Sequence, residues 1–140
     1  MTGAGVPTPP GVAADDPSVE YWRALAERRI RLEQCGACGR HRVVPMPSCP
    51  WCGDPATTIV DAVGTGHVYS WITVHRAFDD RHAGDVPYTV AAVELTESCR
   101  VFARLEADPD AVTIGLALAA RYVAHDGWTE LRFAPAESAR

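Results

Sequence analysis

The sequence predicts a mainly β protein in which an N-terminal helix and a rubredoxin-like zinc ribbon precede a five-stranded OB-fold barrel. Two closely spaced Cys-x-x-Cys pairs predict the ribbon, a short apolar stripe with helical spacing precedes them, and about five alternating runs separated by turn residues follow. The chain has 140 residues, of which 47% are hydrophobic, so it can bury the core of a small globular protein. We expect a flexible leader over 1–15, helix and ribbon over 16–55, and the barrel over 56–140.

The N-terminal segment, MTGAGVPTPPGVAADDP, has neither the basic start nor the apolar centre of a signal peptide. Its Pro and Gly content indicates a flexible leader. No run of about 18 apolar residues occurs in the chain, so we predict no membrane-spanning segment. Five cysteines, four of them in two tight pairs, are more typical of a reducing compartment than of a secreted disulfide framework, so a cytoplasmic location is expected.

A short helix is predicted after the leader. Asp16 is suited to its N-cap and Pro17 to its first helical position. The apolar residues that follow recur at spacings of three and four and form one stripe, so the helix must pack on something to be stable. The stripe consists of Val19, Trp22, Leu25, Ala26 and Ile30. The alternation over 30–34 then predicts a strand that leads into the first cysteine pair.

Four cysteines, Cys35, Cys38, Cys49 and Cys52, have the spacing C-x2-C-x10-C-x2-C. Two residues between cysteines allow a tight turn to aim both thiolates at one point, and four thiolates complete the tetrahedral shell of a structural zinc ion. No position is left for the water that a catalytic zinc needs. Two disulfides, four free thiols and iron are the alternatives, and we predict zinc. The fifth cysteine, Cys99, is expected to be a buried or semi-buried strand residue.

The barrel is predicted from runs that alternate between apolar and polar residues. Their number suits a small closed barrel, and Asp108-Pro109-Asp110 and Gly115 provide turns between strands. The predicted strands are 68–75, 88–95, 100–105, 118–122 and 128–133.

Charge and composition exclude several function classes. The net charge is −5, and all 13 basic residues are arginine. Without lysine, Schiff-base chemistry and a P-loop are excluded. OB-folds and zinc ribbons also occur in single-stranded nucleic-acid-binding proteins, which makes this the alternative function, but an acidic chain repels a polyanion. The five histidines are scattered, and we find no catalytic set of residues.

The order of helix, ribbon and barrel resembles a family of acyl-CoA-associated proteins that join a rubredoxin-like zinc ribbon to a C-terminal OB-fold. The resemblance covers nearly all of the chain after the leader. It lies in Tyr21-Trp22, in LEQCGACG at 32–39, in Pro45 and Pro47, in CPWCG at 49–53 and in GTGHVYSW at 64–71.

This resemblance implies a non-catalytic subunit of a hetero-oligomer, with structural zinc and no nucleic acid. The family's partners are thiolase-like enzymes, including the lipid-transfer-protein-type aldolases of steroid side-chain breakdown, and acyltransferases of polyketide pathways. Other members are fused to hydratase-like domains, for which 140 residues leave no room, so we expect this chain to act in trans. In some complexes the OB-fold borders the region that binds CoA.

One face of the first barrel strand is expected to be aromatic. Tyr69, Trp71 and His75 alternate with aliphatic residues, which would fill the barrel. The aromatic face must then be covered from outside, either by the N-terminal helix and ribbon or by the partner enzyme or its acyl-CoA. The predicted surface, continued by the loop that follows, comprises Tyr69, Trp71, His75, Arg76, Phe78 and Tyr88.

Overall fold

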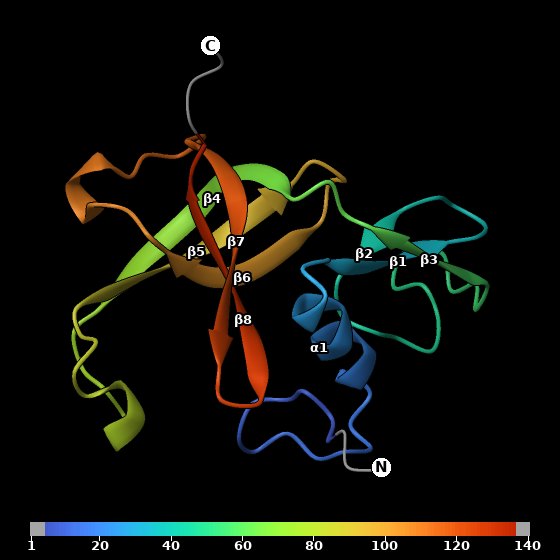
Figure 1. Ribbon diagram of the computed structural model, residues 1–140. Helices are drawn as coiled ribbons and strands as arrows, with labels where there is room; N and C mark the ends of the chain where they lie inside the picture. Colours follow the sequence, from blue (N-terminus) through green and yellow to red (C-terminus); the bar gives the residue numbers. More distant parts are fainter. Residues whose placement is uncertain (1–4, 137–140) are drawn as a thin grey trace.

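The computed structural model describes residues 5–136 and shows a ribbon sheet beside a β-barrel (Figure 1). Residues 1–4 of the predicted leader and 137–140 of the predicted barrel segment lie outside the described residues. No helix within 5–136 is long and apolar enough to cross a membrane. The elements are α1 (Val19–Ala26), β1 (Arg31–Cys35), β2 (His41–Arg42), β3 (Thr57–Asp61), β4 (Thr65–Val74), η1 (Asp80–His82), β5 (Tyr88–Leu95), β6 (Arg100–Leu105), η2 (Pro109–Ala111), β7 (Ala117–His125) and β8 (Trp128–Pro135).

The helix begins later than the sequence predicts. Asp16 Oδ1 accepts hydrogen bonds from the backbone N and the Oγ of Ser18, at 2.8 and 2.6 Å, and so holds a turn that precedes the helix. The first residue of α1 is Val19, with Ser18 at the N-cap, so Asp16 is not the N-cap and Pro17 is not the first helical residue. The local turn bonds of Asp16 and Ser18 displaced the start of the helix.

The buried side of α1 also differs in part from the predicted stripe. Leu25 is fully buried as predicted, but Ala24 rather than Ala26 is its buried neighbour. The helix ends at Ala26, and Arg28 then takes a positive φ of 63°. Ile30, predicted as the last residue of the stripe, is fully buried but lies in the link to β1. Ending the helix early lets the chain turn into the ribbon sheet.

The ribbon sheet has the strand order β2-β1-β3, and both pairs are antiparallel. β3 pairs with β1 from Arg31↔Asp61 to Cys35↔Thr57. The ribbon sheet therefore extends past residue 55, where we expected the ribbon to end, and the barrel strands begin at Thr65.

The barrel is closed, with the strand order β4-β5-β6-β8-β7, and this confirms the predicted mainly β fold with a five-stranded barrel. Neighbouring strands are antiparallel except for β6 and β8. α1 packs against β7, β8 and β1, between barrel and ribbon (Figure 1). Leu25, Ile30 and Leu32 belong to the same buried cluster as Val68 and Phe133 of the barrel. Ribbon and barrel thus share one hydrophobic core.

A β-bulge in β4 changes which side chains face the core. Val68 pairs with Val93 and Ser70 with Ala92, so the register shifts at the residue between them, Tyr69. An inserted residue moves every following side chain to the other side of the sheet. Val68, which precedes the bulge, is buried. Trp71, which follows it, also packs against the core, whereas Ile72 is 63% exposed. The prediction that Tyr69 and Trp71 share an outward face is wrong for this reason.

Candidate metal centre and surface sites

The four paired cysteines converge at the end of the ribbon. Their Sγ atoms all lie within 4.8 Å of one another, and none forms a disulfide. The Sγ atoms of Cys35 and Cys52 are 3.6 Å apart, and those of Cys38 and Cys49 are 3.7 Å apart. In a tetrahedral site with Zn–S bonds of about 2.3 Å, two sulfurs are about 3.8 Å apart. The donor set and its spacing fit a tetrahedral thiolate metal site.

Both cysteine pairs lie in turns of the same construction. The N–H of Gly39 donates to the carbonyl of Cys35 at 3.0 Å, and the N–H of Gly53 donates to the carbonyl of Cys49 at 2.8 Å. The two glycines have φ values of 79° and 80°, a conformation that glycine adopts without strain. The repeated geometry explains why the sequence has Gly directly after each Cys-x-x-Cys pair.

Backbone N–H groups in these turns face the sulfurs and affect their ionisation. The N–H of Cys38 donates to Cys35 Sγ at 3.4 Å and lowers the pKa of that thiol. The corresponding N–H of Cys52 is the main reason why the pKa of Cys49 falls to about 6. Cys52 itself accepts a hydrogen bond from the Asp54 N–H, but its bonds to the other thiols raise its pKa to about 11. The two buried cysteines are thus prepared to act as thiolates, the form that binds metal.

A buried ion pair braces the ribbon behind the cysteines. Glu33 is 7% and Arg42 5% exposed, and they are partners in the β1–β2 register. Arg42 Nε donates to Glu33 Oε1 at 2.9 Å, while its Nη2 donates to Thr57 Oγ1 at 2.9 Å. Glu33 Oε1 also accepts from the N–H of Met46 at 3.2 Å. This network, which the sequence analysis missed, joins all three ribbon strands to the loop before the second cysteine pair.

The structure separates the six residues of the predicted aromatic surface. Trp71 faces the core, whereas Tyr69 is 47% and Phe78 88% exposed. Tyr88 is half-buried on β5, and His75 and Arg76 are exposed beyond the end of β4. Arg76 lies over the ring of Phe78 at 5.6 Å. Their role in binding a partner or acyl-CoA stays a prediction.

The outward side of β4, β5 and β6 forms a surface that we call the outer face. Ile72, 63% exposed, and Phe102, 77% exposed, lie at its centre. At one end Arg100 lies 3.6 Å from the ring centre of Tyr69, and at the other Arg104 lies 3.9 Å from that of Tyr88. The residues of the outer face are Tyr69, Ile72, Tyr88, Arg100, Phe102 and Arg104.

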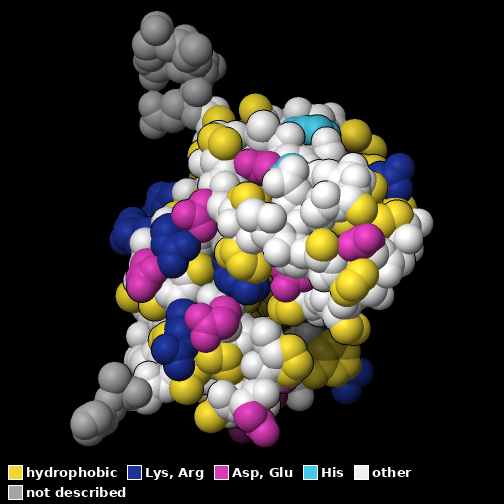
Figure 2. All heavy atoms as spheres, turned by 90° about the vertical axis from the view of Figure 1, so that its right-hand side faces the viewer, with side chains coloured by type: hydrophobic (Ala, Val, Ile, Leu, Met, Phe, Trp, Pro, Cys, Tyr) yellow, Lys and Arg dark blue, Asp and Glu magenta, His cyan; other side chains and the backbone are white. Residues whose placement is uncertain are grey.

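Among residues 5–136, the ribbon borders the outer face only at its Arg100 end, where residues of the segment 41–51 line a cavity with Glu94 and Arg100, and Ile72 and Phe102 stay exposed. α1 packs on β7 and β8. The alternation of β6 places Phe102 opposite the buried Val101 and Ala103, so its exposure could have been predicted from the sequence. The exposure of Ile72 could not, because it depends on the bulge. Figure 2 shows the molecule from the ribbon side. On this side, most of the visible charged side chains, of both signs, lie on the left of the view.

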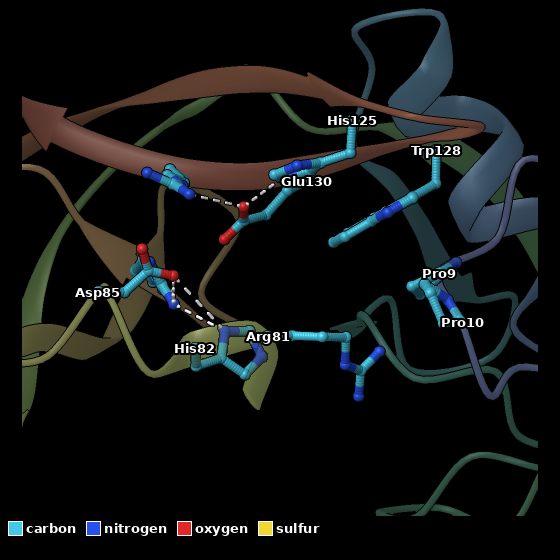
Figure 3. A pocket seen from close by; sticks show the side chains of 10 residues that line it. Pro9, Pro10, Arg81, His82, Asp85, His125, Trp128 and Glu130 are labelled. Carbon is cyan, nitrogen blue, oxygen red and sulfur yellow. Dashed lines mark hydrogen bonds and ion pairs between the residues drawn. The ribbon is translucent and has the colours of Figure 1, made fainter. Parts of the chain in front are cut away.

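A cavity of about 400 Å³ lies between the β4–β5 connection and the β7–β8 hairpin (Figure 3). Pro9 and Pro10 of the leader form part of its wall opposite Arg81, so this part of the leader lies against the barrel. His82 and His125, far apart in the sequence, both line it. The histidines are scattered along the sequence, and only the folded barrel brings these two together.

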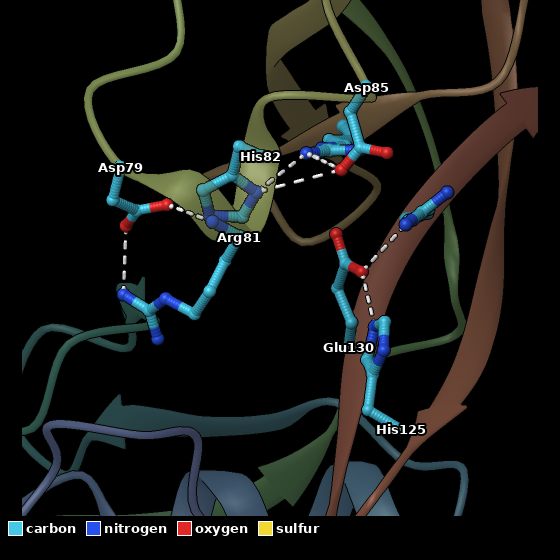
Figure 4. Close-up of polar contacts among 8 residues, drawn as sticks. Asp79, Arg81, His82, Asp85, His125 and Glu130 are labelled. Atoms are coloured by element: carbon cyan, nitrogen blue, oxygen red, sulfur yellow. Dashed lines mark hydrogen bonds and ion pairs between the residues drawn. The ribbon is translucent and has the colours of Figure 1, made fainter.

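Each carboxylate of the cavity is bonded to basic neighbours (Figure 4). Asp85 Oδ2 accepts from Arg104 Nη2 at 3.1 Å, which lowers the pKa of Asp85. Glu130 Oε1 accepts from Arg132 Nη2 at 2.9 Å and lies 2.7 Å from His125 Nε2. Burial raises the pKa of Glu130, but these hydrogen bonds outweigh it and hold the pKa below its usual value. The network fixes the loop and the hairpin that form the cavity.

Cys99 lies apart from the metal centre, directly before β6. It is 7% exposed, and burial raises the pKa of its thiol to about 11. The prediction of a buried residue is confirmed, although Cys99 precedes the strand rather than belonging to it.

Two family models match adjacent parts of the chain: the rubredoxin-like zinc ribbon domain of ChsH2 over residues 22–58, and the C-terminal OB-fold domain of ChsH2 over 59–123. A probable enoyl-CoA hydratase alpha subunit of Thermomonospora curvata is 40% identical over 97 residues, which are 69% of this chain and 30% of that protein. The 3-oxo-4,17-pregnadiene-20-carboxyl-CoA hydratase alpha subunit of Mycobacterium tuberculosis is 30% identical over 118 residues, 84% of this chain and 37% of that protein. This chain therefore spans only 30% and 37% of the length of these two relatives.

Shorter relatives match over most of their length. A DUF35 domain-containing scaffold protein of Methanothermobacter thermautotrophicus is 29% identical over 101 residues, 70% of this chain and 75% of that protein. A chain of the solved Ltp2-ChsH2(DUF35) aldolase is 33% identical, with a TM-score of 0.77 over 91% of this chain and 98% of that chain. A DUF35 protein from Sulfolobus solfataricus, 19% identical with a TM-score of 0.60 over 86% of each chain, shares the fold. The chain thus belongs to the DUF35 family, with the zinc ribbon and C-terminal OB-fold of ChsH2.

Proposed function

We propose that this chain is a non-catalytic accessory subunit that binds and supports a thiolase-like or lipid-transfer-protein-type enzyme acting on acyl-CoA substrates, such as those of steroid side-chain degradation. The observation that carries the proposal is the match to a chain of the Ltp2-ChsH2(DUF35) aldolase over 98% of that chain's length. The relative named as a scaffold protein points the same way. The hydratase alpha subunits contain the matching region within a longer chain.

A subunit of this kind supplies shape rather than reacting groups. The shared core of Leu25, Leu32 and Phe133 fixes the ribbon to the barrel, so surfaces on both keep a constant relation to each other. The acyl-CoA would be handled by the partner enzyme, with this chain contributing only indirectly.

We propose that Cys35, Cys38, Cys49 and Cys52 hold a structural zinc ion. The ion would supply a cross-link between the two turns, and the four thiolates leave no coordination site for a reacting water. The Sγ spacing of 3.6 and 3.7 Å supports this assignment. Elemental analysis of the purified protein is expected to give about one zinc per chain, and an equivalent amount of iron with little zinc would overturn it.

Nucleic-acid binding gains no support from the outer face. Its two arginines are paired with carboxylates, Arg100 with Glu94 at 2.8 Å and Arg104 with Asp85 at 3.1 Å. In addition, a chain with a net charge of −5 repels a polyanion.

Co-expression tests the proposed function. The tagged chain is co-expressed with a thiolase-like or lipid-transfer-protein-type enzyme from the same organism, and the eluted complex is assayed for cleavage of an acyl-CoA. We expect the two chains to elute together and the enzyme to be more stable or more active in the complex. An enzyme that elutes separately and is fully active alone contradicts the proposal.

A further inference from the structure

We propose that the outer face is where this chain docks the enzyme subunit, through an apolar patch on that subunit bordered by carboxylates. This inference rests on the proposed function and names the surface that it uses. The outer face is the convex side of β4, β5 and β6, away from the elements that α1 covers.

Its centre is apolar because of the strand register. Ile72 pairs with Val90 and Phe102 with Ala92, so two large exposed side chains lie on either side of β5, whose outward residues here are also apolar. Phe102 and Ile72 would gain the transfer free energy of burial only if another surface covered them. Two large exposed side chains on either side of β5, with Val90 and Ala92 between them, indicate a binding surface rather than scattered exposure.

Each of its two ends joins an arginine to a tyrosine ring and a carboxylate, but the side chain of Arg100 is 50% exposed and that of Arg104 only 15%. Arg100 lies over the ring of Tyr69 and binds Glu94, while Arg104 lies over the ring of Tyr88 and binds Asp85. Stacking and ion pairing hold each guanidinium in place, and a guanidinium has five N–H donors, more than these contacts use. An apolar centre with Tyr and Arg at the rim is the usual anatomy of a protein interface.

The charge of this surface favours a different protein over a second copy. Arg100 pairs with Glu94 and Arg104 with Asp85, whereas Arg76, just beyond β4, forms no ion pair with any residue in 5–136. A symmetric dimer would bring the same face against itself and oppose these arginines to one another. Carboxylates on the enzyme subunit would instead accept hydrogen bonds from the unused N–H donors.

The test compares affinities of purified variants for the purified enzyme subunit by calorimetry. The double variant Ile72→Ala/Phe102→Ala removes the apolar centre, and Arg100→Gln/Arg104→Gln removes the rim cations. The control, Val63→Ala/Ile114→Ala, truncates two residues that are 73% and 74% exposed outside the outer face. We expect the first variant to bind at least roughly tenfold more weakly, the second to lose affinity and most of its salt dependence, and the control to bind like the wild type.

The outcomes separate this inference from the proposed function. If the wild type does not bind the enzyme, the proposed function fails. If the wild type binds and both outer-face variants bind equally well with unchanged circular dichroism, the docking surface is wrong. Sedimentation of the chain alone gives a further check: a dimer that Phe102→Ala dissociates would assign the face to a second copy and overturn the proposal.

Discussion

At the scale of single residues, two neighbouring side chains of β4 lie in opposite environments. Trp71 packs against the core, and Ile72, next to it, is 63% exposed. Neighbouring residues of a strand always point to opposite sides, and the bulge at Tyr69 decides which of these two faces the core. A truncation at either position therefore has a different physical effect, the first on stability and the second on binding.

Trp71→Ala is expected to lower the free energy of unfolding by about 2–4 kcal/mol, because it leaves a cavity beside the core. Ile72→Ala, the matched control, is expected to change the free energy of unfolding by about 0.5 kcal/mol or less, because the Ile72 side chain is mostly exposed and few of its contacts are removed. Urea denaturation followed by fluorescence or circular dichroism measures both. A loss at Ile72 equal to that at Trp71 would show that the bulge is misplaced.

At the scale of secondary-structure elements, the close approach of β4 and β5 requires glycine at one position. Gly66 pairs with Leu95, and a Cβ added to Gly66 would collide with the backbone carbonyl of Glu94. Backbone atoms cannot move aside as the end of a flexible side chain can. The close approach of strands here is part of how the barrel closes.

Gly66→Ala is expected to destabilise the protein by roughly 2 kcal/mol or more through this overpacking. Gly84→Ala is the control, since nothing lies within 4 Å of its added Cβ, and it is expected to be neutral or slightly stabilising. Thermal unfolding of the two variants compares them directly, and similar melting temperatures would contradict the collision.

The β7–β8 hairpin carries a pH-dependent contribution through Glu130. Because its pKa is lowered in the folded state, the stabilisation is present above the usual glutamate pKa and is lost as the pH falls through the folded value. Glu130→Gln should therefore flatten the dependence of stability on pH between about 5 and 3. Glu20→Gln on α1, where the carboxylate is in an exposed pair with Arg23, should leave the slope unchanged, and an equal change in both would contradict the role of Glu130.

At the scale of the whole molecule, the metal centre and the barrel are linked through the common core. Ile30, in the link to β1, and Leu32, in β1, belong to the same buried cluster as barrel residues such as Phe133. Unfolding of the ribbon would therefore remove apolar contacts that stabilise the barrel.

Removal of the metal with a strong chelator is expected to unfold the ribbon and lower the melting temperature of the whole chain, because the binding energy of a structural metal is folding energy. Hydrogen exchange should increase first in β1, β2 and β3. Cys49→Ser is expected to behave like the chelated protein, whereas Cys99→Ala, outside the cluster, should keep its metal. A chelated protein with unchanged exchange in the ribbon would show that the metal is not structural.

Local patterns in the sequence were sufficient to predict the ribbon, the barrel strands and the clustering of the four cysteines. Cys35 and Cys38, with the glycine after them, make a turn within a few residues, and the alternation of Val101, Phe102 and Ala103 depends only on the strand that holds them. These features are predictable because the interactions that determine them act between near neighbours in the chain.

The candidate surface depended on contacts between distant segments. The bulge at Tyr69 is a matter of how β4 pairs with β5, and it turned Trp71 inward and Ile72 outward. The pairing of Glu33 with Arg42 likewise depends on the register of two strands. The alternation within β1 alone does not reveal it.

Spacing and alternation are local properties, so they were enough to predict that this protein joins a four-cysteine ribbon to a small barrel. The open face of the barrel follows from contacts between distant segments, because α1 packs on β7 and β8 and the bulge redirects β4. Side-chain direction in a sheet reverses with each residue. A single unpaired position, which no local pattern reveals, is therefore enough to exchange the buried and the exposed surfaces.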